Sequence, residues 1–72
     1  MRMQVIVREN QSPEPRWEVS LVGAIACRAT SYESLGDAMV KLRESVEAYL
    51  KREAVFLDTA APGFYDIRER EL

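Results

Sequence analysis

The segment that most constrains the fold runs from Ser34 to Leu50 and reads SLGDAMVKLRESVEAYL. It combines a helix-start signal with apolar residues at helical spacing. Asp37 follows Ser34 by three residues, as in a capping box, where the serine hydroxyl accepts a hydrogen bond from the backbone N–H of the third helical residue. The acidic side chain also suits the positive end of the helix dipole. The pattern predicts one helix over Leu35–Arg52, capped by Ser34 and Asp37.

The apolar residues of this segment fall on one stripe, because they recur at steps of three and four. Glu44 and Glu47 are three residues apart and could in principle hold a metal ion, but the neighbouring lysines and arginines favour a solvated charged face. A helix of this kind covers one face of a sheet. The residues expected to face the core are Leu35, Ala38, Met39, Leu42, Val46, Tyr49 and Leu50.

Three β-strands are predicted before the helix. Met3–Arg8 is rich in β-branched residues, Arg16–Val22 alternates strictly between apolar and polar residues, and Ala24–Thr30 follows a glycine. The loop between the first two strands, ENQSPEP, carries two prolines, which disfavour both helix and ladder pairing. The strand residues expected in the core are Val5, Val7, Trp17, Val19, Leu21, Ile25 and Cys27.

The residues after the helix carry weaker patterns. Ala54–Leu57 fits either the end of the helix or a short strand, and Phe64–Glu71 alternates enough to form a last strand. The sequence therefore predicts a single α+β domain over residues 1–72. Its three- to four-stranded antiparallel sheet, in the order β-β-β-α-β, has one amphipathic helix packed on one face.

The sheet face away from the helix requires a second cover. A chain of 72 residues buries only about 60% of its extended surface, so its core is thin. An uncovered apolar face or strand edge promotes association. We therefore expect a homodimer, or a complex with another protein. The candidate interface residues are Ile6, Val22, Phe64, Tyr65 and Ile67.

The residue inventory does not favour catalysis. The chain contains no histidine, which is the commonest general base and metal ligand, and its one cysteine, Cys27, reads as a small buried hydrophobic residue. No glycine-rich phosphate-binding spacing occurs. We predict no catalytic, cofactor-binding or metal-binding residue and no enzyme activity.

Charge and hydropathy restrict the partners. The 10 basic and 12 acidic residues are mixed along the chain, which argues against direct nucleic-acid binding. No apolar run approaches the length of a membrane span, and the first residues are not a signal peptide pattern. We expect a cytoplasmic protein without membrane association.

The order of strand, proline-bearing loop, strand beginning near a tryptophan, strand and helix resembles the HicB-like antitoxin family. Family members open the helix with a Thr-Leu-Glu-Glu-Ala-Leu segment, and their second strand with an aromatic residue and a valine. The matching residues here are Trp17, Val19, Ser34, Leu35, Asp37, Ala38 and Met39. The similarity covers about Val5 to Leu50.

This resemblance implies a partial ribonuclease-H-like fold and an antitoxin role, in which the protein binds and occludes a small basic mRNA-cleaving toxin of the HicA type. The chain departs from the family at SLVGAIACRA, which replaces a Pro-x-Leu-Pro-Gly-Cys segment, and at Gly36, which replaces a glutamate. Twenty residues follow Arg52, too few for the DNA-binding domain of many members. The alternative function is a small dimeric adaptor with another partner.

Overall fold

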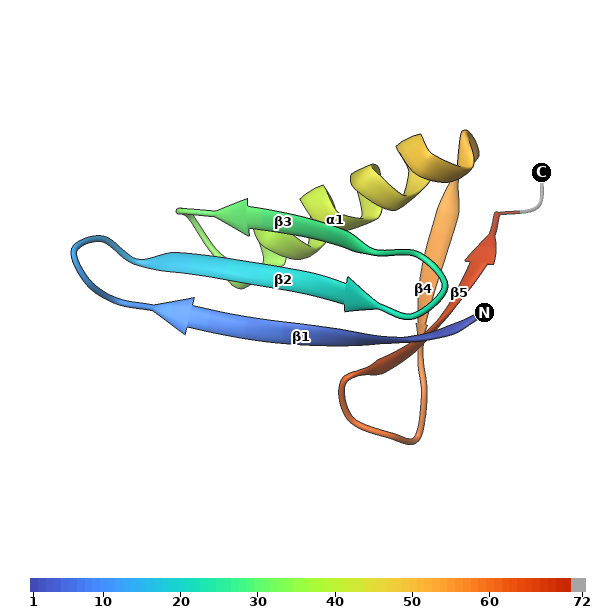
Figure 1. Cartoon of the computed structure of the whole chain (residues 1–72), viewed down its shortest axis with the longest axis horizontal. Coiled ribbons are helices and arrows are strands. Elements are labelled where there is room, and N and C mark those ends of the chain that lie inside the picture. Colours follow the sequence, from blue (N-terminus) through green and yellow to red (C-terminus); the bar gives the residue numbers. More distant parts are fainter. Residues whose placement is uncertain (71–72) are drawn as a thin grey trace.

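Five β-strands and one α-helix make up residues 1–70, the part of the chain that the computed structural model describes. They are β1 (Arg2–Asn10), β2 (Arg16–Val22), β3 (Cys27–Ser31), α1 (Leu35–Leu50), β4 (Ala54–Asp58) and β5 (Phe64–Glu69). All strand pairs are antiparallel, in the spatial order β3-β2-β1-β5-β4. The sheet twists strongly, so that β4 and β5 run steeply across the direction of β1–β3 (Figure 1).

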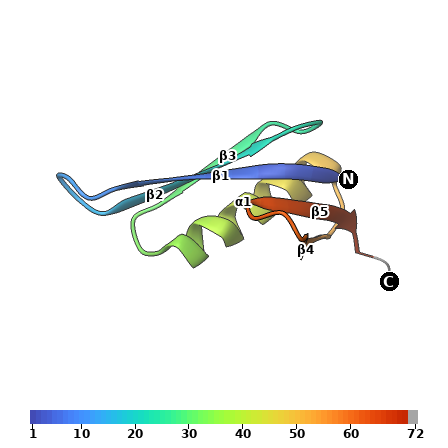
Figure 2. The ribbon, with the colours of Figure 1, turned by 90° about the horizontal axis from the view of Figure 1, so that it is seen from below.

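The helix lies on one face of this sheet. It packs against β3, β2 and β4, and the view in Figure 2 shows it on one side of the first three strands. The α+β class with an antiparallel sheet and a single helix on one face is therefore confirmed for the described residues. We refer to the opposite side of the sheet as the outer face.

The predicted number of strands was too low. Ala54–Leu57 belongs to β4 and is not the end of the helix, because α1 stops at Leu50 and Lys51 adopts a left-handed conformation with a φ of 57°. The Lys51 N–H donates to the Glu47 carbonyl and so closes the helix two residues before the predicted end at Arg52. The resulting order is β-β-β-α-β-β.

The bounds of β1 and β3 also differ from the prediction. β1 is longer, since its pairing with β2 continues to Asn10. β3 begins at Cys27 and not at Ala24, because the preceding residues form a turn in which Gly23 has a φ of 148°. The second strand has the predicted bounds. β5 ends at Glu69, earlier than predicted, and the predicted end at Glu71 lies outside the described residues.

The core lies between α1 and the inner face of the sheet. The buried apolar residues are Met3, Val5, Val19, Leu21, Ile25, Ala29, Ala38, Leu42, Val46, Ala54 and Ile67. The half-buried residues that pack against them are Trp17, Cys27, Met39, Leu50, Phe56 and Tyr65. Phe56 and Tyr65 meet with their ring centroids 6.1 Å apart.

Three residues predicted to be in the core are exposed. Val7 is on the inner side of β1, but α1 packs on β2, β3 and β4 and not on β1, which leaves Val7 exposed. Leu35 and Tyr49 lie in the first and last turns of the helix. The buried helix positions, Ala38, Leu42 and Val46, form a narrower line than the predicted stripe because the sheet beneath is small.

Candidate functional site

The start of α1 is held by a compact set of hydrogen bonds. The Ser34 side chain accepts from the backbone N–H of Asp37 at 3.0 Å. Ser31, which is fully buried, donates its hydroxyl hydrogen to Asp37 Oδ2 at 2.7 Å and accepts from the N–H of Glu33 at 3.0 Å. These contacts join the end of β3 to the helix start, so their role is structural.

The sequence reasoning did not identify Ser31. The sequence pattern that could have identified it is the alternation of β3, in which Cys27, Ala29 and Ser31 share the side that faces the helix. A serine at a buried position requires hydrogen-bond partners, and the chain provides them locally. The pKa of Asp37 lies below its usual value, mainly because Ser31 donates a hydrogen bond to the carboxylate and secondly because Lys41 contacts it.

The outer face carries a group of exposed apolar side chains. Ile6 is 46% exposed and Val22 48% exposed, and Phe64 is half-buried. Gln4 pairs with Val22 on one side and with Phe64 on the other, which places these residues around one position of β1. We call Ile6, Val22 and Phe64 the outer apolar cluster.

Two of the five candidate interface residues face the opposite side. Tyr65 pairs with Met3, which is buried on the inner face, and Ile67 is only 2% exposed. Phe64 and Asp66 therefore occupy the outer positions of β5. Ile67 belongs to the core, and the assignment of Ile67 to an interface was wrong because alternation alone did not fix which side of the last strand faces the helix.

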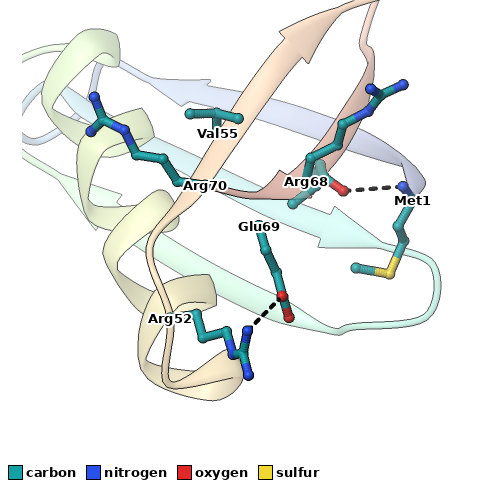
Figure 3. Close-up of a pocket in the computed structure, with 7 residues that line it drawn as sticks. Met1, Arg52, Val55, Arg68, Glu69 and Arg70 are labelled. Atoms are coloured by element: carbon teal, nitrogen blue, oxygen red, sulfur yellow. Dashed lines mark hydrogen bonds and ion pairs between the residues drawn. The ribbon is translucent and has the colours of Figure 1, made fainter. Parts of the chain in front are cut away.

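A broad hollow of about 1050 Å³ lies beside β4 and β5 (Figure 3). Three arginines lie in or beside it, but each has an acidic partner. Arg52 is 3.3 Å from Glu69, Arg68 is 2.8 Å from Asp66, and Arg70 is 3.8 Å from Glu53, measured between the charged atoms. The hollow therefore offers no unpaired cluster of positive charge for an anion.

Asp66 is engaged twice. The Met1 amino group donates to Asp66 Oδ1 at 2.8 Å, and Arg68 Nε contacts Oδ2 at 2.8 Å. The pKa of Asp66 is lowered, mainly by the hydrogen bond from the Met1 amino group and secondly by that from Arg68. The carboxylate stays charged at neutral pH and ties the first residue to β5.

The acidic residues in the described part of the chain lie apart from one another and do not form a metal-binding centre. Glu18 pairs with Arg8 on β1 and Asp66 with Arg2, so six residues of β1 separate them, about 20 Å at the rise of a strand. Glu44 is on the helix, whose contacts are with the inner face. Within residues 1–70, no group of three or more histidine, cysteine, aspartate or glutamate side chains is arranged to hold a metal ion.

Cys27 begins β3 and is half-buried against the core, with a free thiol. It pairs with Leu21 across the β2–β3 ladder. Packing accounts for its position. No helix among residues 1–70 has the length and apolar character needed to cross a membrane.

Comparison with known proteins gave no match: no family model, curated protein or solved structure is significantly similar to this chain. The surfaces of the sheet described above are therefore the structural basis for inferring a function.

Proposed function

We propose that this chain is a non-catalytic protein-binding module that associates with partner proteins through the surfaces of its sheet. The observation that carries this proposal is the outer apolar cluster, because Ile6 and Val22 expose nearly half of their surface on a face that the helix does not cover. Exposed apolar side chains grouped on one face are typical of interaction sites. The proposal includes a homodimer.

The partner that we propose first is a small basic mRNA-cleaving toxin, which the module would bind and occlude as an antitoxin. This identity depends on the resemblance to HicB-like antitoxins over Val5–Leu50, and the fold agrees with it in the first three strands and the helix. Occlusion requires a binding surface and no reacting group on this chain. The role is thus compatible with the lack of convergent carboxylates in the described residues.

A dimeric adaptor with a different partner is the second candidate. Arg8 and Arg28 lie with Ile6 around a small depression on the outer face, which also contains Glu18. A basic toxin that docked there would meet like charge, whereas an acidic or neutral protein would not. This local charge is the observation that supports the adaptor as the second candidate.

Affinity capture from the source cells tests the function. We would compare the chain carrying a C-terminal tag with an Ile6→Lys variant, and with Tyr49→Lys as a control on the exposed side of the helix. Stoichiometric capture of one protein that Ile6→Lys abolishes and Tyr49→Lys preserves would support the proposal. Equal loss or equal retention in both variants, with unchanged circular dichroism, would exclude the outer face as the binding surface.

A further inference from the structure

We infer that the free edge of β4 is the dimer interface, and that it pairs antiparallel with the same edge of a second copy about a two-fold axis at Leu57. The inference depends on the homodimer in the proposed function and identifies its surface. β3 and β4 are the two outermost strands of the sheet that residues 1–70 form, so one edge of β4 has no neighbouring strand there. An unpaired edge presents backbone donors and acceptors to another strand.

The backbone contacts show which residues point to this edge. The Glu53 carbonyl accepts from the Arg70 N–H and so faces β5. The Ala54 N–H faces away from β5 and donates to the Glu47 carboxylate at 2.8 Å. Because the direction of these groups alternates along a strand, the N–H and C=O of Phe56 and Asp58 also point to the free edge.

The Glu47 contact selects the register. Since Glu47 already satisfies the Ala54 N–H, the complete pairs of free groups on β4 belong to Phe56 and Asp58. These two residues are related by a two-fold axis through Leu57. Phe56 then pairs with Asp58 of the second copy, and Asp58 with its Phe56, so that each pair exchanges two backbone hydrogen bonds.

The side chains around this axis suit the same arrangement. Leu57 is 44% exposed and would lie directly opposite Leu57 of the second copy. A groove of about 360 Å³ runs between β4 and α1 and is mostly apolar. It is lined by Met39, Val40, Arg43, Val55, Phe56 and Leu57. Apolar side chains on both sides of the axis would become buried on pairing.

Charge complementarity supports the same register. Asp58 is exposed and makes no ion pair within residues 1–70, whereas Arg43 lines the groove beside Phe56. Because Asp58 of one copy lies opposite Phe56 of the other, its carboxylate approaches Arg43 across the interface. The two-fold axis produces this contact twice. The present partner of Arg43, Glu47, is at the long distance of 4.0 Å.

The open part of the β1 edge lacks this complementarity. β1 pairs with β5 only from Arg2 to Gln4, which leaves its second half open on that side. The Val5 N–H bonds to Gly63 at this edge, so Val7 and Glu9 supply the next free groups. A two-fold axis between Val7 and Glu9 would place Arg8 of one copy opposite Arg8 of the second copy. Like charges directly opposite are destabilising, so the β4 edge is favoured over this part of β1.

Disulfide trapping tests the register in a Cys27→Ala background. With the two-fold axis at Leu57, Leu57→Cys brings two thiols together at a Cα separation of about 4.5 Å, which a disulfide spans. Val55→Cys is the matched control, because its two copies would be about 13 Å apart along the strands. With oxidised glutathione we expect covalent dimers of Leu57→Cys and monomers of Val55→Cys on a non-reducing gel. Trapping at Val55, or at neither position, would overturn the inference.

A charge exchange separates the interface from the homodimer itself. Arg43→Asp and Asp58→Arg should each weaken the dimer at least tenfold by sedimentation, and the double variant should recover most of the loss. If the wild type is a dimer and all three variants dimerise as strongly, the homodimer is retained and the β4 edge is excluded as its interface. A wild type of 8.2 kDa would exclude both. Partner capture by the outer face is measured separately and does not depend on either result.

Discussion

The Glu47 carboxylate accepts a hydrogen bond from the backbone N–H of Ala54 at 2.8 Å, which fastens the last turns of α1 to the first residue of β4. Glu47 is seven residues before Ala54, and the turn between them contains the left-handed Lys51. The helix and the edge strand are thereby fixed relative to each other. This contact also leaves only part of the β4 edge free for another strand.

Removing this acceptor should loosen β4. We expect Glu47→Ala to lower the free energy of unfolding by about 1 to 2 kcal/mol, because it leaves the Ala54 N–H without its charged partner. The Ala54 amide should exchange with solvent faster, which nuclear magnetic resonance measures directly. Glu44→Ala is the control, and its effect should stay within about 0.5 kcal/mol. Unchanged exchange at Ala54 would mean that the contact is not maintained in solution.

The buried line of α1 should dominate its contribution to stability. Leu42 and Val46 are fully buried, so Leu42→Ala and Val46→Ala should each destabilise the fold by about 2 to 5 kcal/mol through lost burial and a residual cavity. Lys41→Ala should change the stability by only about 0.5 kcal/mol, because its ion pair with Asp37 is on the surface. Thermal and denaturant melts decide the matter. Similar losses for buried and exposed positions would contradict the helix orientation.

Ser31 should contribute to stability in a pH-dependent way. Ser31→Ala removes the acceptor of the Glu33 N–H, at a cost of about 1 to 3 kcal/mol at neutral pH. The same hydroxyl lowers the pKa of Asp37 by stabilising its charged carboxylate. This contribution to stability is complete at a pH above 3.8, the ordinary pKa of the group, and it is lost as the pH falls through the lowered pKa. The difference between wild type and Ser31→Ala should therefore be smaller at pH 3 than at pH 7. A constant difference would contradict the link to Asp37.

Local patterns predicted the parts of the fold in which one physical signal was strong. Strict alternation located Arg16–Val22, and the serine cap followed by apolar residues at helical spacing located the start of α1. Both depend on residues close together in the sequence. The class of the fold follows from them, since a single amphipathic helix needs a sheet to cover.

The features that sequence reasoning missed depend on distant contacts. AVFL forms a strand because β5 pairs with it and Glu47 caps its first N–H, and neither partner is adjacent in the sequence. The burial of Ile67 follows from the pairing of β5 with β1, which no local pattern specifies. Val7 has the parity of a core residue and is exposed because α1 packs on β2, β3 and β4 and not on β1. Tertiary packing decided each case.

Isothermal titration of the chain against its captured partner tests stoichiometric binding, as opposed to catalysis, most directly. We expect saturation near one chain per partner, and loss of the heat signal with Ile6→Lys but not with Tyr49→Lys. The chain alone should neither cleave RNA with magnesium or manganese present nor shift duplex DNA at physiological salt. Absence of saturable binding would contradict the proposed function. So would metal-dependent RNA cleavage that is abolished by Glu18→Gln, Glu44→Gln or Asp66→Asn while circular dichroism shows that the fold survives.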